Sequence, residues 1–341
     1  MKEDGSSSIL VLNIVIILSI LCSGAFLFIK TGSKYIAQSK KKDQEREMLI
    51  TEVVRLVKLL GEDNTPDSNS IAERDALQKS EGKDITVIVK DASSRLNLNW
   101  IIGEELKATG MLKSGKSYFE FQSFRAEKGI LSDFSRYVDF IKEEDIVSYF
   151  TPYNYFNINV CSELMLENLY YTRTGDKEKA ARFRNDIQIF RQKSKAGSVK
   201  MIEQDSLIEF LGKENYGLLY PVVNALPVMN IHFIPENIMV TLFRYFKIKN
   251  PEEKAEYITA LREISELSVE NLKQIIGEEY YTKNRLHHYI GTITWFWEIT
   301  VKKNDEIQNV IELKWFVARI PQIEGQEEKV VYRLIKEEFL K

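Results

Sequence analysis

An uncharged apolar run of 21 residues, 9–29, is the feature of this sequence that most constrains its fold. As a helix rising ~1.5 Å per residue, the run would be about 31 Å long, enough to cross the hydrocarbon core of a bilayer. A cleaved secretory signal has a shorter apolar core and a basic start. Here Lys2 is offset by Glu3 and Asp4. The run therefore predicts a permanent transmembrane helix over 9–29.

The helical pattern continues beyond the apolar run. Apolar residues recur at the spacing of one helix face, at Leu49, Val53, Leu56, Val57 and Leu60. No proline interrupts residues 7–60, and Gly61 with the polar residues after it ends the pattern. We expect one long helix over 6–61, followed by a polar linker over 62–83.

The rest of the chain predicts an α+β fold. Ile85, Val87 and Val89 alternate with other residues in a first strand, which we place within 84–99. Residues 100–285 are predicted to be mostly helical, with one strand candidate over 117–124. Residues 286–341 contain two alternating stretches joined by a turn, which predicts an antiparallel hairpin, and a candidate third strand. The expected order is a long helix and an antiparallel sheet that is interrupted by a large helical insert.

Three stretches share an element that opens with asparagine. Its members are Asn97 and Asn99 in the first stretch, Asn157, Asn159 and Glu163 in the second, and Asn230, His232 and Glu236 in the third. Asparagine side chains bond nearby backbone groups where an extended segment turns into a helix. We interpret the stretches as strand-to-helix or loop-to-helix junctions. The alternative is a helix-hairpin-helix DNA-binding module, whose glycine hairpin the two later stretches lack.

A short polar leader ending in Gly5, followed by a long helix with an apolar first half, resembles the type IV pilin and pseudopilin superfamily. The resemblance implies that a prepilin peptidase cuts after Gly5 and leaves Ser6 as the first mature residue. It also implies a single-pass inner-membrane protein with a cytoplasmic N-terminus and a periplasmic head. Charge alone favours the reverse orientation, because lysines such as Lys30 and Lys34 follow the apolar run.

Leu10, the fifth residue after the cleavage point, stands where most members of that superfamily carry a glutamate. The absence of this glutamate is characteristic of the type II secretion protein K family, the minor pseudopilins at the filament tip. The chain also resembles this family in the order of its elements: Asn97 and Asn99 after the first strand, the element at 157–163, and a closing strand that ends at Arg319.

The resemblance implies a pilin-like sheet with an inserted helical domain and a non-catalytic role in protein secretion across the outer membrane. The implied partners are other minor pseudopilins, contacted through N-terminal helices and head domains. Two alternatives stay open: a minor pilin of a type IV pilus, and a membrane-tethered DNA-binding protein of an uptake system.

Signals of an enzyme are weak. Residues 110–117 match the phosphate-loop pattern Gly-x4-Gly-Lys-Ser. Such a loop needs a strand before it and a helix after it. This one is predicted to run from a helix into a strand, so we interpret it as a polar turn. His232, His287 and His288 match no zinc motif, and the adjacent pair is expected to point in different directions.

No cofactor is predicted. Calcium is associated with head domains of the resembled family, but no segment here matches a calcium loop residue by residue, so metal ligands are left unassigned. The formal net charge of −3 gives no general attraction to nucleic acid, so no nucleic-acid partner is expected.

Overall fold

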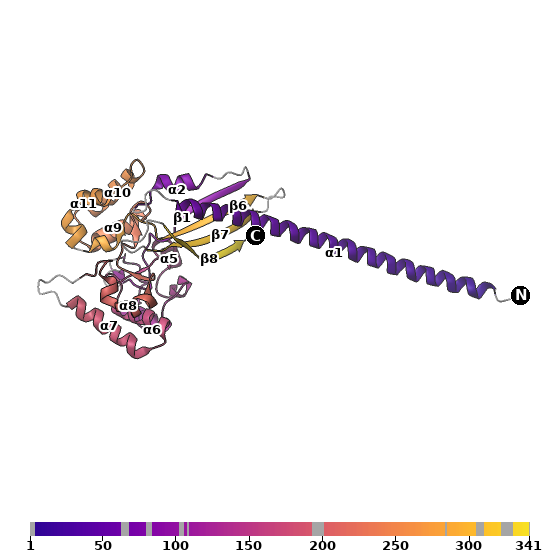
Figure 1. The fold of residues 1–341 in the computed structure, drawn as a ribbon, viewed down its shortest axis with the longest axis horizontal. Helices are drawn as coiled ribbons and strands as arrows, with labels where there is room; N and C mark the ends of the chain where they lie inside the picture. Colours follow the sequence, from indigo (N-terminus) through magenta and orange to yellow (C-terminus); the bar gives the residue numbers. More distant parts are fainter. Residues whose placement is uncertain are drawn as a thin grey trace. The chain divides into compact units, whose positions relative to one another are not determined.

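The computed structural model describes residues 4–62, 68–79, 84–101, 106–107, 109–192, 201–283, 285–304, 310–321 and 330–340. The chain divides into two compact units, Met1–Val54 and Arg55–Lys341. The first unit consists of most of one helix, and the second contains the sheet and the remaining helices (Figure 1).

Helix α1 spans Asp4–Gly61 and so continues from the first unit into the second. The backbone of the predicted anchor, 9–29, lies in this helix, but of its side chains only Phe28 belongs to the described part. The side chains of Gly5, Ser6 and Leu10 lie outside that part. Among the described residues, no helix combines the length and the apolar character needed to cross a membrane.

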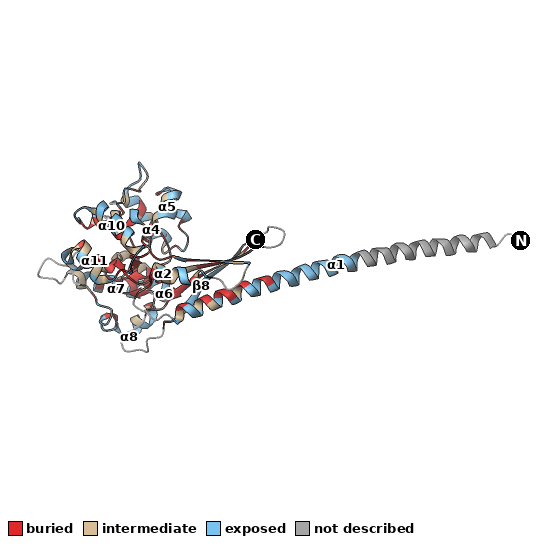
Figure 2. Cartoon of the chain, turned by 90° about the horizontal axis from the view of Figure 1, so that it is seen from above, coloured by how far each residue is buried: buried red, intermediate tan, exposed pale blue. Residues whose placement is uncertain are grey.

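The predicted apolar stripe of α1 is buried at four of its five positions. Leu49, Val53, Leu56 and Leu60 are buried, and Val57 is half-buried. N-terminal to this stripe, the described side chains from 28 to 44 are exposed apart from Gly32 (Figure 2). The predicted amphipathic face of this part of the helix is therefore confirmed.

The sheet of the second unit is antiparallel throughout, in the order β1-β6-β7-β8. Its strands are β1 (Ile85–Asp91), β6 (Phe296–Asn304), β7 (Val310–Arg319) and β8 (Tyr332–Leu340). Strands β6 and β7 are the predicted hairpin, and β8 is the predicted third strand. The first strand ends at Asp91 rather than Asn99, because the Asp91 carboxylate accepts from the N–H groups of Ser93 and Ser94 and the chain turns there.

Strand alternation separates the two faces of the sheet. Ile299 and Val301 of β6 are fully buried on one face. Lys302, the next residue, points to the other face and pairs with Glu312 of β7 at 2.7 Å. The sheet therefore contributes one apolar face to the core, as its alternating sequence predicts, and carries a charged pair on the other.

Between β1 and β6 lies the predicted helical insert. Its helices are α4 (Tyr118–Lys128), α5 (Glu143–Tyr149), α6 (Glu163–Thr174), α7 (Lys177–Gln192), α8 (Leu207–Leu219), α9 (Glu236–Tyr245), α10 (Pro251–Arg262) and α11 (Val269–Ile276). Shorter turns are η1 (Phe134–Tyr137), η2 (Glu279–Lys283) and η3 (Leu286–His288). Two-residue parallel pairs join β2 (Phe156–Asn157) to β3 (Val223–Asn224) and β4 (Met229–Asn230) to β5 (Ile290–Gly291). One continuous apolar core runs through the insert, seen as the red interior of Figure 2.

The strand predicted over 117–124 is wrong, because α4 begins there. Ser117 accepts a hydrogen bond from the Glu120 N–H, and the Glu120 carboxylate accepts one from the Ser117 N–H. This reciprocal capping box starts a helix. Phe121 and Arg125, four residues apart, are then both buried on one helix face.

The region 62–83, predicted to be a polar linker, also contains a helix. Helix α2 spans Ile71–Leu77 and opens with a second capping box, between Ser70 and Glu73. Its last residue, Leu77, is buried. The described part of this region is therefore packed structure rather than a linker.

Candidate functional site

The asparagine elements open three similar units of the insert. In each unit the side-chain oxygen of the first asparagine accepts a hydrogen bond from the backbone N–H two residues later. These bonds join Asn97 to Asn99 at 2.8 Å, Asn157 to Asn159 at 2.7 Å, and Asn230 to His232 at 3.0 Å. The second and third elements lead from β2 into α6 and from β4 into α9. The predicted strand-to-helix junctions are confirmed at these two sites.

The second residue of each element holds a distant backbone segment. Asn99 accepts from the Leu131 N–H at 2.9 Å and donates to the Leu131 carbonyl at 2.8 Å. Asn159 bonds both backbone groups of Ile202 in the same way, each at 2.8 Å. A carboxamide can do this because it carries a donor and an acceptor side by side.

The third unit replaces this amide with a histidine. His232 Nε2 lies 3.3 Å from the Leu267 nitrogen and 3.1 Å from the Leu267 carbonyl oxygen. One ring nitrogen is either a donor or an acceptor, so His232 makes one of these bonds at a time. Burial lowers the pKa of His232 to about 4, which keeps the ring neutral at physiological pH.

An arginine from a later helix donates to two carbonyl groups of each junction. Arg125 Nη1 donates to Leu98 (3.0 Å) and Ile101 (2.7 Å), Arg191 Nη2 to Ile158 (2.6 Å) and Cys161 (2.8 Å), and Arg262 Nη1 to Ile231 (3.1 Å) and Ile234 (2.6 Å). The acceptors are always the first and fourth residues after the first asparagine. The sequence-based prediction missed these arginines.

Each unit closes on its own opening residues through a parallel backbone bridge. Leu96 bridges Phe150, β2 pairs with β3, and β4 pairs with β5. The described insert therefore repeats one arrangement over 96–150, 156–224 and 229–291. The asparagine elements are the structural junctions of this repeat.

The two glutamates of the elements have separate surroundings. Glu163 pairs with Arg191, the same arginine that holds the second junction. Glu236 is exposed in the first turn of α9, where the helix dipole stabilises its negative charge. The structure does not bring the two carboxylates together.

Asn230 lies where the insert meets the sheet. Its Nδ2 donates to the Asn69 carbonyl at 2.8 Å and to Thr294 Oγ1 at 3.0 Å. Thr294 Oγ1 in turn donates to Asp91 Oδ2 at 2.9 Å. Burial raises the pKa of Asp91, and hydrogen bonds from Ser94 and neighbouring hydroxyls oppose the rise. This buried network fastens the third unit to the end of β1.

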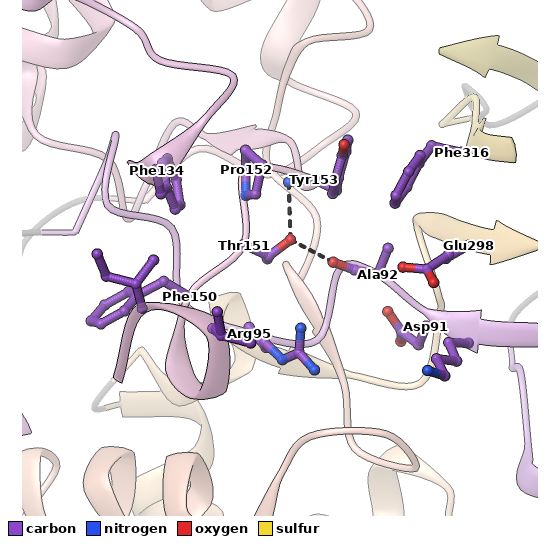
Figure 3. Close-up of a pocket in the computed structure, with 13 residues that line it drawn as sticks. Asp91, Ala92, Arg95, Phe134, Phe150, Thr151, Pro152, Tyr153, Glu298 and Phe316 are labelled. Atoms are coloured by element: carbon purple, nitrogen blue, oxygen red, sulfur yellow. Dashed lines mark hydrogen bonds between the residues drawn. The ribbon is translucent and has the colours of Figure 1, made fainter. Parts of the chain in front are cut away.

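A cavity of about 340 Å³ lies beside this network, between the end of β1, helix α5 and strands β6 and β7 (Figure 3). Thr151 Oγ1 donates to the Ala92 carbonyl at 2.7 Å and accepts from the Tyr153 N–H at 3.1 Å. The Tyr153 ring stacks on Phe316 with centroids 4.2 Å apart. The residues that line the cavity include Glu298 but none of the asparagine elements. The contacts described here fix the backbone and the rings of the cavity wall, and none of them pairs a nucleophile with a base.

The phosphate-loop pattern at 110–117 is followed by helix α4, so the prediction that a strand follows it is wrong. Residues 106–107 and 109, before it, are helical rather than extended. The Glu120 carboxylate accepts from the Ser117 N–H at 2.7 Å and so occupies the N-terminus of α4, where a bound phosphate would lie. Lys116 lies over the Phe140 ring at 5.3 Å. The surroundings of this pattern suit a capped turn.

The rings of His287 and His288 have centroids only 3.9 Å apart, so the expectation that they point in different directions is wrong. The tight turn η3 brings them together. Burial lowers the pKa of His288 to about 3, and its Nδ1 lies 3.4 Å from Asn159 Nδ2. Across the described residues, no group of three or more His, Cys, Asp or Glu side chains is placed to hold a metal ion.

No protein-family model and no curated protein matches the chain.

Proposed function

We propose that this chain is a non-catalytic minor pseudopilin at the tip of a type II secretion pseudopilus, with a role in protein secretion across the outer membrane. The observation that carries the proposal is the position of the insert. Strand β1 ends at Asp91 and its sheet neighbour β6 begins at Phe296, so the helical units interrupt the sheet between two strands that pair. A sheet divided in this way is what the resemblance to the type II secretion protein K family implies.

The proposal gives the two ends of α1 different roles. Its first part would anchor the chain in the inner membrane, with the N-terminus in the cytoplasm and the head in the periplasm, after cleavage behind Gly5. Leu10 would leave the subunit without the glutamate that most members of the superfamily carry at this position, which suits a position at the filament end. The partners would be other minor pseudopilins.

Co-purification tests the proposal. The intact chain, tagged at its C-terminus, is captured from detergent-solubilised membranes of cells that express the secretion system. Other minor pseudopilins are expected in the captured material at near-equal amounts. Capture of the chain alone, from cells in which those pseudopilins are present and processed, would contradict the proposal.

A further inference from the structure

The described stretch of α1 just after the apolar run is strongly basic. Between residues 30 and 42 the sequence has five lysines and no acidic residue. These lysines are Lys30, Lys34, Lys40, Lys41 and Lys42, and all are exposed. Lys41 pairs with Glu45 at 3.8 Å. A surface of this charge is complementary to anionic phosphate groups.

Aromatic side chains lie on a different face of the helix from Lys30 and Lys34. With about 100° of turn per residue, Phe28 and Tyr35 share one stripe, and the two lysines share another that lies roughly 100–160° around the helix. Phe28 is 82% exposed and Tyr35 is 75% exposed. Exposed aromatic rings next to an apolar helix are typical of the membrane–water interface.

The helical rise separates the lysines into two groups. Headgroups extend about 5–8 Å beyond the hydrocarbon core of a bilayer. If the core ends near residue 29, Lys30 and Lys34 lie within about 8 Å of it, whereas Lys40 and Lys42 lie about 17–20 Å away. The second pair is beyond a Debye length of about 8 Å at physiological salt, so its attraction to the surface is largely screened.

We propose that Lys30 and Lys34, together with Phe28 and Tyr35, bind the phosphate headgroups of anionic phospholipids and set the depth at which α1 enters the bilayer. This inference rests on the proposed role of 9–29 as a membrane anchor. Beyond the anchor itself, the inference names the class of lipid that is bound and the four residues that bind it.

Two double variants with the same loss of charge test the inference. Lys30→Gln/Lys34→Gln removes the proximal pair, and Lys40→Gln/Lys42→Gln removes the distal pair. The full chain, purified in a neutral detergent, is titrated with phosphatidylglycerol, phosphatidylcholine or glycerol phosphate, and bound molecules are counted by native mass spectrometry.

Each lysine at an anionic lipid surface contributes about a fivefold gain in affinity. The proximal variant is therefore expected to weaken phosphatidylglycerol binding about thirtyfold, and the distal variant less than about threefold. Phosphatidylcholine and glycerol phosphate are expected to bind weakly to all forms. Equal weakening by both variants, equal binding of the two lipids by the unmodified chain, or glycerol phosphate binding as tightly as the lipid would overturn the inference.

Extraction of membranes with alkaline carbonate separates this inference from the proposed function. Release of the unmodified chain into the soluble fraction would overturn the membrane anchor and the lipid site together. Retention of the chain in the membrane, without a preference for phosphatidylglycerol, would overturn the lipid site alone and leave the anchor standing.

Discussion

Asn159 holds two backbone groups of a buried loop with one side chain. It accepts from the Ile202 N–H and donates to the Ile202 carbonyl, both at 2.8 Å, and it is itself 5% exposed. A buried backbone group that loses its partner costs about 1–3 kcal/mol. Asn159 therefore contributes more to the free energy of unfolding than the size of its side chain suggests.

Replacement of Asn159 by alanine is expected to lower the free energy of unfolding by about 3 kcal/mol, because both Ile202 groups would lose their partner. The measurement is urea unfolding of the full chain in a mild nonionic detergent, followed by tryptophan fluorescence. Asn185→Ala is the matched control, since Asn185 is exposed on α7. A loss in the Asn159 variant no larger than in the control would contradict this role.

His232 and His288 predict acid sensitivity of the fold. Burial lowers their folded pKa values from 6.5 to about 4 and about 3. The unfolded chain therefore binds more protons below pH 6.5, and stability falls as the pH drops from about 6.5 towards 4. Between pH 6.5 and 5 each histidine is expected to lower the free energy of unfolding by about 2 kcal/mol.

The variant His232→Gln isolates one of these contributions. Its stability at neutral pH is allowed to change, but its loss between pH 6.5 and 5 should be smaller than that of the unmodified chain by about 2 kcal/mol. The same urea titrations at both pH values give this difference. An unchanged pH dependence would show that His232 is not held neutral by burial.

The openings of the repeated units could be predicted from single residues, and their closures could not. Asn157 and Asn230 act locally, on a backbone group two residues away, so a short pattern is enough to identify them. The backbone groups that Asn159 and His232 bind, at Ile202 and Leu267, lie in loops that no local pattern marks. A weak signal does exist, because Arg125, Arg191 and Arg262 follow the first asparagines by 28, 34 and 32 residues.

At the scale of elements, two helix starts were missed although both carry the same capping signal. Both α2 and α4 open with Ser-x-x-Glu, at Ser70–Glu73 and Ser117–Glu120, and both form complete capping boxes. The aromatic alternation after Ser117 resembled a strand. The capping box and the burial of Phe121 and Arg125 on one helix face outweigh that weak preference.

Ser117→Ala is expected to remove the capping box of α4 and lower the free energy of unfolding by about 1 kcal/mol. Since Lys116 and Ser117 also belong to the phosphate-loop pattern, nucleotide binding is measured in parallel by calorimetry with magnesium and ATP. We expect no binding to the unmodified chain or to either variant, Ser117→Ala or Lys116→Ala. Binding that is lost in Lys116→Ala would contradict the assignment of this stretch as a capped turn.

At the scale of the whole molecule, the sheet depends on residues that are far apart in sequence. Strand β1 pairs with β6 across the entire insert, with Val89 opposite Ile299. The network of Asn230, Thr294 and Asp91 lies where the chain leaves the sheet and where it returns. The α+β class and the order of elements follow from the sequence patterns. The repeat inside the insert depends on contacts between distant loops and had to be observed.

The mature N-terminus of this chain shows whether it is processed as a pseudopilin. The full chain is isolated from cells with an active prepilin peptidase and sequenced from its N-terminus, beside Gly5→Ala and the matched control Gly32→Ala. Gly32 lies in α1 with nothing within 4 Å of its added Cβ, so its change should be harmless. We expect Ser6 as the first residue of the unmodified chain and of the control, and an uncut chain for Gly5→Ala. An intact Met1 on unmodified chains that assemble normally would contradict this expectation.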